Sequence, residues 1–188
     1  MRPRRLGIRR SILVLAASAS MTGCVTDSVQ TSSNRTVPPE PRTAAPTPEG
    51  TAINTLAVLK SQRPIDTNGN GFPNRLDVAV YLFSRPYPAP RHSAGTLRFL
   101  YYPMGSVDPV IGASEEPLAE WVFEQEVLPL AAIDDIIGPG YAFALDLSSI
   151  GLSSLPVDAA DLVVEFAPTD GGDPVRSPSV QRVPFRVQ

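Results

Sequence analysis

The stretch LDVAVYLF, residues 76–83, carries the clearest fold signal in the sequence. Its β-branched and aromatic residues, and its partial alternation of apolar and polar positions, are typical of a β-strand. The next apolar run, TLRFLYY at residues 96–102, has the same character and is bounded by Gly95 and Pro103, which are residue types that punctuate strands. Short strands separated by Pro and Gly turns are therefore the expected building pattern of the domain.

Further runs of this kind lie on both sides of the first two. They are residues 52–59, 118–123, 141–147, 161–166 and 180–187. The first fits a strand or a short helix, and Pro184 makes the last an edge strand, because proline cannot donate to a sheet ladder. Six or seven short strands predict a mainly β fold, an antiparallel β-sandwich of immunoglobulin-like or C2-like type.

One segment, EQEVLPLAAIDDII at residues 124–137, departs from the strand pattern. Its apolar positions recur about every 3.6 residues, as on one face of a helix. They are Val127, Leu130, Ala131, Ile133, Ile136 and Ile137. Pro129 falls near the first turn, where proline is tolerated, and Gly138 follows as a stop. The segment is predicted to form one short crossover helix between two strands.

The chain begins with an export signal. Five arginines and no acidic residue precede an apolar run at residues 12–19, which is shorter than the roughly 20 residues of a transmembrane helix. This arrangement predicts a signal peptide over residues 1–23. The pair Arg9-Arg10 is also similar to a twin-arginine motif, so the general secretory and twin-arginine routes both stay open.

The end of this signal, Met21-Thr22-Gly23-Cys24, resembles the lipobox of bacterial lipoproteins, and Cys24 is the only cysteine. The resemblance implies that a diacylglycerol alkylates the Cys24 thiol, that the chain is cut before it, and that the new amino group is acylated. Two or three acyl chains anchor a protein stably on a bilayer. Because Val25 follows, the implied location is the outer membrane, facing the periplasm or the cell surface. An ordinary signal peptide with a chance cysteine is the alternative.

Residues 24–50 contain this cysteine and a stretch rich in Ser, Thr and Pro, which predicts a disordered tether. Residues 51–188 are the predicted β-sandwich domain. Of the 16 Lys and Arg residues, five lie in the signal, so its removal leaves 11 against 19 Asp and Glu, a net charge of −8. An acidic chain whose only lysine is Lys60 predicts no nucleic-acid partner.

Several motifs of the domain occur in an order that resembles small, uncharacterised lipoproteins of planctomycete-type bacteria. They are D-T-N-G-N-G at residues 66–71, V-x-V-Y-L-F at 78–83, A-E-W-x-F at 119–123 and G-P-G-Y-x-F-x-L at 138–145. The resemblance covers roughly the middle of the domain and implies no known activity.

The stretch IDTNGNGFPNRLD, residues 65–77, has oxygen-bearing groups at the spacing of a calcium loop. The candidate ligands are Asp66, Asn68, Asn70, the Phe72 carbonyl, Asn74 and Asp77, with Gly71 at the sharp turn. The pattern resembles loops of dockerins and thrombospondin-type calcium repeats. Only two of the five side chains carry charge, so the expected site is weak. The alternative is a purely structural turn rich in Asn-Gly pairs. No other cofactor is expected.

Catalytic signals are sparse. The only histidine, His92, lies in a Pro-rich segment that is typical of a surface loop. Five glutamates surround Trp121, and paired carboxylates can hydrolyse glycosides, although a solvated acidic face is the simpler interpretation. They are Glu115, Glu116, Glu120, Glu124 and Glu126. The leading hypothesis is a non-enzymatic, lipid-anchored binding or structural module whose partner is an envelope protein or a glycan. The alternatives are a calcium-stabilised carbohydrate-binding or adhesion module and a small carbohydrate-active enzyme.

Overall fold

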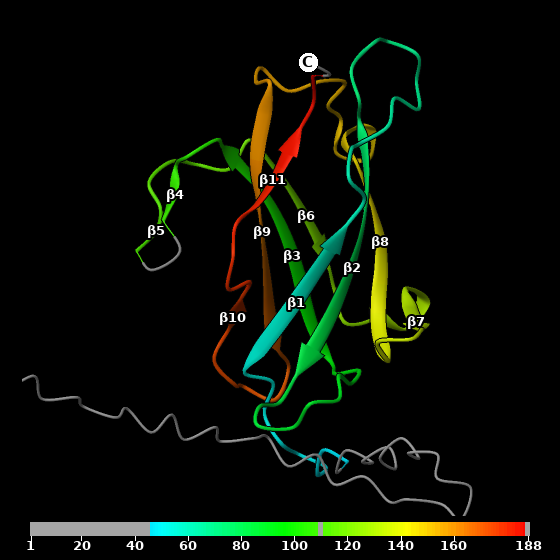
Figure 1. Ribbon diagram of the computed structural model, residues 1–188, viewed down its shortest axis with the longest axis vertical. Coiled ribbons are helices and arrows are strands. Elements are labelled where there is room, and N and C mark those ends of the chain that lie inside the picture. The colour runs from blue at the N-terminus through cyan, green and yellow to red at the C-terminus, as the bar shows by residue number, and fades with distance from the viewer. Residues whose placement is uncertain (1–45, 109–110, 187–188) are drawn as a thin grey trace, which may run out of the picture. The chain divides into compact units, whose positions relative to one another are not determined.

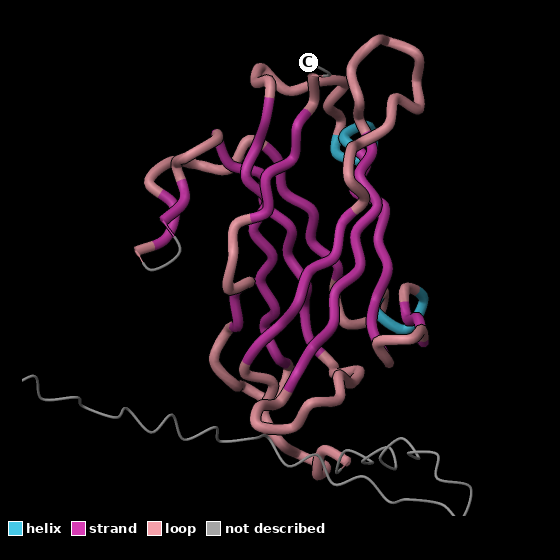
Figure 2. Tube along the Cα trace, in the orientation of Figure 1, coloured by secondary structure: helices cyan, strands magenta, loops and turns pink. Residues whose placement is uncertain are grey.

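Two antiparallel β-sheets face each other in the computed structural model, which describes residues 46–108 and 111–186 (Figure 1). Strands and loops make up nearly all of this part of the chain (Figure 2). The predicted signal peptide, Cys24 and most of the predicted tether lie outside the described residues. Of the tether, residues 46–50 are described, and they end in a turn in which the Thr51 amide donates to the Pro48 carbonyl at 3.3 Å.

The first sheet has the strand order β1-β2-β8-β7, and the second has the order β10-β9-β3-β6 with β11 also paired to β9. The first contains β1 (Thr55–Lys60), β2 (Arg75–Phe83), β7 (Ala132–Asp134) and β8 (Pro139–Asp146). The second contains β3 (Gly95–Pro103), β6 (Ala119–Phe123), β9 (Ala159–Pro168), β10 (Val175–Arg176) and β11 (Gln181–Pro184). This is the A-B-E-D and G-F-C-C′ order of immunoglobulin domains. The predicted antiparallel sandwich is confirmed, and of its two types the strand order fits the immunoglobulin-like one.

All the strands predicted from the sequence are present, and the first run is a strand, β1. Pro184 lies on an edge strand, as expected. The Phe185 amide donates to the Asp158 carbonyl at 2.9 Å, so the next pair, Pro184 with Ala159, is one whose backbone groups point outward. The strands that the sequence did not predict are β7, β10, β4 (Val107–Asp108) and β5 (Gly112–Ala113). Each has only two or three residues, too few for periodicity to appear.

The core lies between the two sheets and is built mainly from alternate residues of each strand, which face inward. Its aromatic centre comprises Phe99, Phe123 and Phe143, whose ring centroids are 4.3–5.6 Å apart. Trp121 is also buried, and its indole N–H donates to the Asp146 carbonyl at 3.1 Å. That hydrogen bond joins the end of the first sheet to the second and satisfies the one polar atom of the buried ring.

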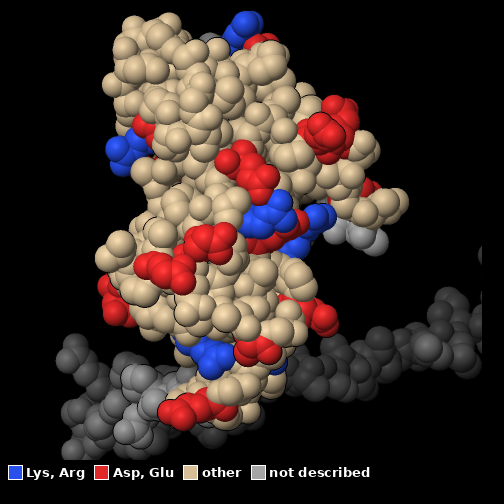
Figure 3. Space-filling model, turned by 180° about the vertical axis from the view of Figure 1, so that it is seen from behind, with Lys and Arg blue, Asp and Glu red and all other residues tan. Residues whose placement is uncertain are grey.

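The outer face of the second sheet carries a row of ion pairs. Arg98 lies between Glu120 and Glu165, with N–O distances of 2.7 and 3.4 Å. Arg176 also contacts Glu165, at 2.5 Å. Seen from behind, acidic and basic side chains adjoin across the middle of the molecule (Figure 3). These charges are therefore paired with each other.

The predicted crossover helix over residues 124–137 is wrong. The segment forms a 3-10 turn, η1 (Leu128–Leu130), followed by strand β7. Leu128 is buried in the core and Ala131 packs partly against it, whereas Leu130 is 87% exposed and Ile136 is fully exposed. The apolar spacing therefore does not mark a buried helical face.

A tight turn explains why β7 forms in place of a helix. Asp135 and Gly138 exchange backbone hydrogen bonds of 3.0 and 3.3 Å, and Gly138 has a φ of 121° that favours glycine. The Tyr81 hydroxyl donates to the Asp135 carboxylate at 2.5 Å, and this bond raises the pKa of Tyr81 to about 12. The turn is thereby fastened to β2, and β7 covers the edge of β8.

A second 3-10 turn, η2 (Leu147–Ile150), follows β8 and leads toward β9. The Asp146 carboxylate caps it by accepting from the Ser148 amide at 2.8 Å. Within the residues that the structure describes, no helix has the length and apolar character needed to cross a membrane.

Candidate functional site

The predicted calcium stretch lies at one end of the sandwich, where residues 65–74 connect β1 to β2; we call these residues the Asx loop (Figure 1). The Asp66 carboxylate organises it. One oxygen accepts from the Asn68 and Gly69 amides at 3.1 and 2.7 Å, and the other accepts from the Gly71 amide at 2.8 Å. These backbone donors, with Gly71 first, lower the pKa of Asp66. The carboxylate therefore already serves the fold of the loop.

The next candidate ligands repeat the same local pattern. The Asn68 side-chain oxygen accepts from the Asn70 amide at 3.1 Å, and the Asn70 oxygen accepts from the Phe72 amide at 2.8 Å. The Asn70 amide group also donates to the Ser153 carbonyl at 2.9 Å, across to the segment after η2. The Phe72 ring stacks on Phe185 with centroids 5.1 Å apart. This part of the loop is thus held by successive Asx turns and by contacts with Ser153 and Phe185.

Asn74 is the one buried member of the set, with 2% exposure. Its oxygen accepts from the Thr67 amide at 2.7 Å, and its amide group donates to the Asp146 carboxylate at 2.9 Å. Asn74 therefore connects the start of the Asx loop to the cap of η2. Its buried polar atoms are satisfied within the fold.

Asp77 lies on β2 and contacts the Arg75 guanidinium at 3.0 Å on the exposed side of the strand. The structure thus brings Asp66, Asn68 and Asn70 into one exposed loop, turns Asn74 inward and places Asp77 in the sheet. Across residues 46–108 and 111–186, no three His, Cys, Asp or Glu side chains form a group that could hold a metal ion. Weak calcium binding by the Asx loop stays a prediction.

The glutamates near Trp121 do not share a face with the indole. Glu120 precedes Trp121 on β6, and successive strand residues point to opposite faces. Trp121 is buried in the core, whereas Glu120 pairs with Arg98 on the outer face. Glu124 accepts from the Thr96 hydroxyl at 2.8 Å, and Glu115, Glu116 and Glu126 are exposed.

A hollow of about 550 Å³ lies beside η1 and includes His92, Tyr141 and Glu126 in its lining. The His92 side chain is exposed, as the sequence predicted, and its Nε2 is 2.9 Å from the Gly140 carbonyl. The Tyr141 hydroxyl donates to the Ser93 carbonyl and accepts from the Ser93 amide, both at 2.9 Å. Burial raises the pKa of Tyr141. The His92 Nε2 atom and the Tyr141 hydroxyl are thus engaged in holding the loop before β3.

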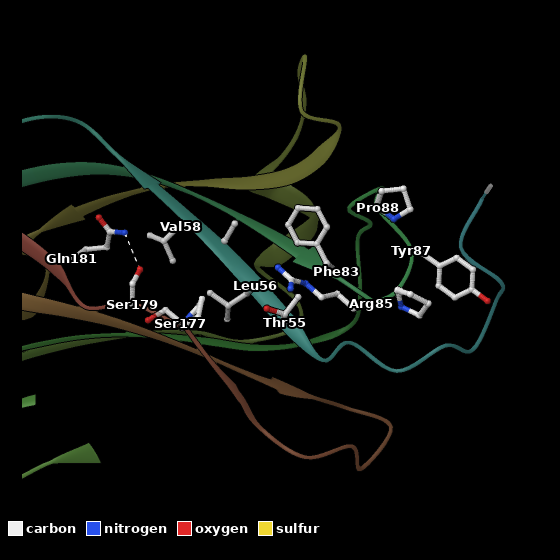
Figure 4. Close-up of a pocket in the computed structure, with 13 residues that line it drawn as sticks. Thr55, Leu56, Val58, Phe83, Arg85, Tyr87, Pro88, Ser177, Ser179 and Gln181 are labelled. Carbon is white, nitrogen blue, oxygen red and sulfur yellow. Dashed lines mark hydrogen bonds between the residues drawn. The ribbon is translucent and has the colours of Figure 1, made fainter. Parts of the chain in front are cut away.

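A groove of about 580 Å³ runs along the free edge of β1, and we call it the β1-edge groove (Figure 4). One wall is residues 55–58 of β1, and the opposite wall is residues 177–179 and Gln181, where the outer strand is interrupted between β10 and β11. Residues 85–88, which follow β2, lie at the Thr55 end (Figure 4). This volume is in the range of ligand pockets.

The backbone of β1 is unpaired along this groove. Ser61 and Asp77 are opposite each other and hydrogen-bonded at 2.9 Å, so alternate residues from Ser61 back to Thr55 bond to β2. The N–H and C=O groups of Leu56 and Val58 consequently point away from β2. Within the described residues β1 pairs with β2 alone, so these backbone groups face the groove without a strand partner.

Arg85 is the one charged residue in the lining of the groove. Its backbone is fixed by Asn54, which accepts from the Arg85 amide at 2.8 Å and donates to the Arg85 carbonyl at 3.0 Å. Its side chain extends back over the Thr55 end of β1 (Figure 4). Within the described part of the chain, the Arg85 guanidinium forms no ion pair, unlike those of Arg98 and Arg176.

The β1-edge groove was not predicted from the sequence. The available signal was the first apolar run, residues 52–59, because the first strand of a sandwich often lies at an edge. The interruption of the opposite strand at Pro178 and the position of Arg85 depend on tertiary packing. No protein-family profile, curated protein or solved structure matches the chain, so the immunoglobulin-like assignment rests on the strand order itself.

Proposed function

We propose that the protein is a non-enzymatic binding module of the bacterial cell envelope, lipid-anchored through Cys24 to the outer membrane. The observation that supports binding is the β1-edge groove, in which open backbone groups face the same space as Arg85, whose guanidinium has no ion-pair partner among the described residues. The lipobox-like sequence ending at Cys24 supports the anchor.

The arrangement of the acidic residues supports a non-enzymatic role. A glycosidase needs two carboxyl groups facing one cleft, about 5–9.5 Å apart. Glu120 is engaged with Arg98, and Trp121, the natural platform for a sugar ring, is buried with its N–H bonded to a backbone carbonyl. The glutamates near Trp121 therefore contribute surface charge in this proposal.

The anchor is tested by membrane fractionation of the Cys24→Ala variant. The wild-type chain should sediment with membranes and incorporate labelled palmitate, and Cys24→Ala should be released and unlabelled. Thr26→Ala, two residues away, is the matched control and should behave as wild type. Retention of Cys24→Ala in the membrane fraction would contradict the anchor.

A second candidate function, a calcium-stabilised carbohydrate-binding or adhesion module, is favoured by the spacing of oxygen atoms in the Asx loop. A weak site has a Kd near 1 mM, so 10 mM calcium would stabilise the fold by about 1.4 kcal/mol. The melting temperature should then rise relative to EDTA in the wild type and not in Asp66→Ala. An equal melting temperature in calcium and EDTA would rule out this function.

A further inference from the structure

The open edge of β1 offers a template for another strand. The outward backbone groups of Leu56 and Val58 are spaced as in any sheet, so an extended peptide can continue the ladder of the first sheet. Edge strands of soluble proteins are usually protected by charge, proline or a covering segment. Here residues 55–59, TLAVL, contain neither a charge nor a proline.

The opposite wall gives such a peptide polar partners. Ser179 and Gln181 face β1 across the groove (Figure 4), whereas the Ser177 hydroxyl accepts from the Val164 amide at 3.2 Å. The Gln181 amide group makes only a long contact of 3.4 Å, to the Ser179 hydroxyl. The Ser179 and Gln181 side chains can exchange that contact for hydrogen bonds to an incoming backbone. A strand seated here would bond to β1 on one side and reach these side chains on the other.

Arg85 gives the site a charge preference and a direction. Its guanidinium is a fixed-geometry donor that suits a carboxylate. An antiparallel strand added to β1 would run from the Lys60 end toward the Thr55 end, where Arg85 lies. Its C-terminal end would therefore meet the guanidinium beside residues 85–88.

We propose, on the basis of the binding function above, that the β1-edge groove captures an extended apolar peptide as an additional antiparallel strand, with the peptide's C-terminal carboxylate bound by Arg85. Leu56 and Val58 supply the main-chain hydrogen bonds. Arg85 selects for the carboxylate, because an amide at the same place leaves the cation without a counter-charge.

A second copy of the chain is the less favourable occupant. Two-fold antiparallel pairing of β1 with the β1 strand of another copy would place each Lys60 near the other copy's Arg85. Neither cation has an acidic partner within the described residues, so like charges would meet at both ends of the interface. A peptide that carries a carboxylate neutralises Arg85 instead.

The test uses the full chain with Cys24→Ala and a library of random ten-residue peptides displayed with free C-termini. Selection should enrich peptides with apolar residues at alternate positions. Each enriched peptide is synthesised with a free C-terminal acid and with a C-terminal amide. The protein should bind the acid form at least tenfold more tightly than the amide form. Arg85→Ala should weaken the acid by a similar factor and leave the amide unchanged. Arg63→Ala, another exposed arginine, is the matched control and should bind as wild type.

Strand addition has its own readout. The Leu56 and Val58 amides should exchange with deuterium readily in the free protein and become protected in the complex, while the Ala57 amide is protected in both. Val58→Pro removes one open N–H without removing a ladder bond to β2, and it should abolish peptide binding. Val58→Lys is the second variant, because an edge lysine also opposes strand addition.

Three results would overturn the proposal. The first is that wild type enriches peptides no more than the Val58→Lys variant does, and the second is that acid and amide forms bind equally. The third is that a peptide binds without protecting the Leu56 and Val58 amides from deuterium exchange. If wild type dimerises as its concentration rises and Val58→Lys does not, the occupant of the β1 edge is a second copy of the chain. Failure of the proposed lipid anchor can be distinguished from failure of the groove proposal. If Cys24→Ala stays with membranes while the peptide results hold, the anchor is wrong and the groove inference stands.

Discussion

The Asx loop follows the Lys60 end of β1, the β1-edge groove runs along residues 55–58 of the same strand, and the two differ in how their polar groups are used. In the Asx loop the side-chain oxygens of Asp66, Asn68 and Asn70 accept hydrogen bonds from backbone amides two to five residues ahead. In the groove the backbone of Val58 and the guanidinium of Arg85 have no such partners among the described residues. The polar groups of the Asx loop are thus hydrogen-bonded within the fold, whereas those of the β1-edge groove remain available to a ligand.

This difference shows why polar composition is a poor guide to binding capacity. A buried or constrained polar group is available to a ligand only if the fold has not already satisfied it. Asn and Asp residues bond readily to nearby backbone, so a run of them tends to satisfy itself. A strand exposes one backbone donor and one acceptor at every second residue of its free edge, whatever its side chains are.

The largest expected effect concerns the two edges of β1. Ala57→Pro removes an N–H that bonds to β2 and should lower the free energy of unfolding by about 3 kcal/mol. Val58→Pro removes an N–H that faces the groove and should lower it by less than about 1 kcal/mol. Urea unfolding of both variants measures the difference. Equal losses would mean that the Val58 amide already has a partner.

A smaller loss is expected where the Asx loop meets the core. Asn74→Ala deletes the buried amide that joins Thr67 to Asp146 and removes the acceptor of the Thr67 amide, so stability should fall by about 2 kcal/mol. Asn70→Ala, in the exposed part of the same loop, should cost about 0.5–1 kcal/mol. Thermal unfolding compares the pair. A loss of stability in Asn70→Ala as large as that in Asn74→Ala would show that the exposed turns, and not the buried Asn74, hold the Asx loop to the domain.

The smallest effect is the acid dependence of the Asx loop. The pKa of Asp66 in the folded state is lowered from 3.8 by backbone donors, so its contribution is present above 3.8 and is lost as pH falls below that value. The wild type should therefore lose more stability than Asp66→Asn between pH 5 and about pH 2. Glu116→Gln, at an exposed carboxylate, is the control and should follow the wild type. Parallel curves for wild type and Asp66→Asn would contradict the role of this carboxylate.

Much of the fold could be predicted from the sequence, because strands of five residues or more show their alternation locally. The runs at residues 76–83 and 96–102 correspond closely to β2 and β3. The segment at residues 124–137 could not be predicted in this way. Its apolar spacing fits a helix, but pairing with β8 and the bond from Tyr81 to Asp135 favour a turn and a short strand. The β8 partners are close in sequence, but Tyr81 is 54 residues from Asp135 and lies beyond any local pattern.

The candidate functional features also divide into those set by neighbouring residues and those set by tertiary contacts. The sequence alone determined the lipobox-like motif at Cys24, the acidic character of the domain and the loop-forming nature of residues 65–74, since each depends on neighbouring residues. Only the tertiary structure decided that Asn74 turns inward and that Leu56, Val58 and Arg85 share a groove. Strand order in a sandwich is set by contacts between distant segments, and it alone determines which backbone edge has no neighbour.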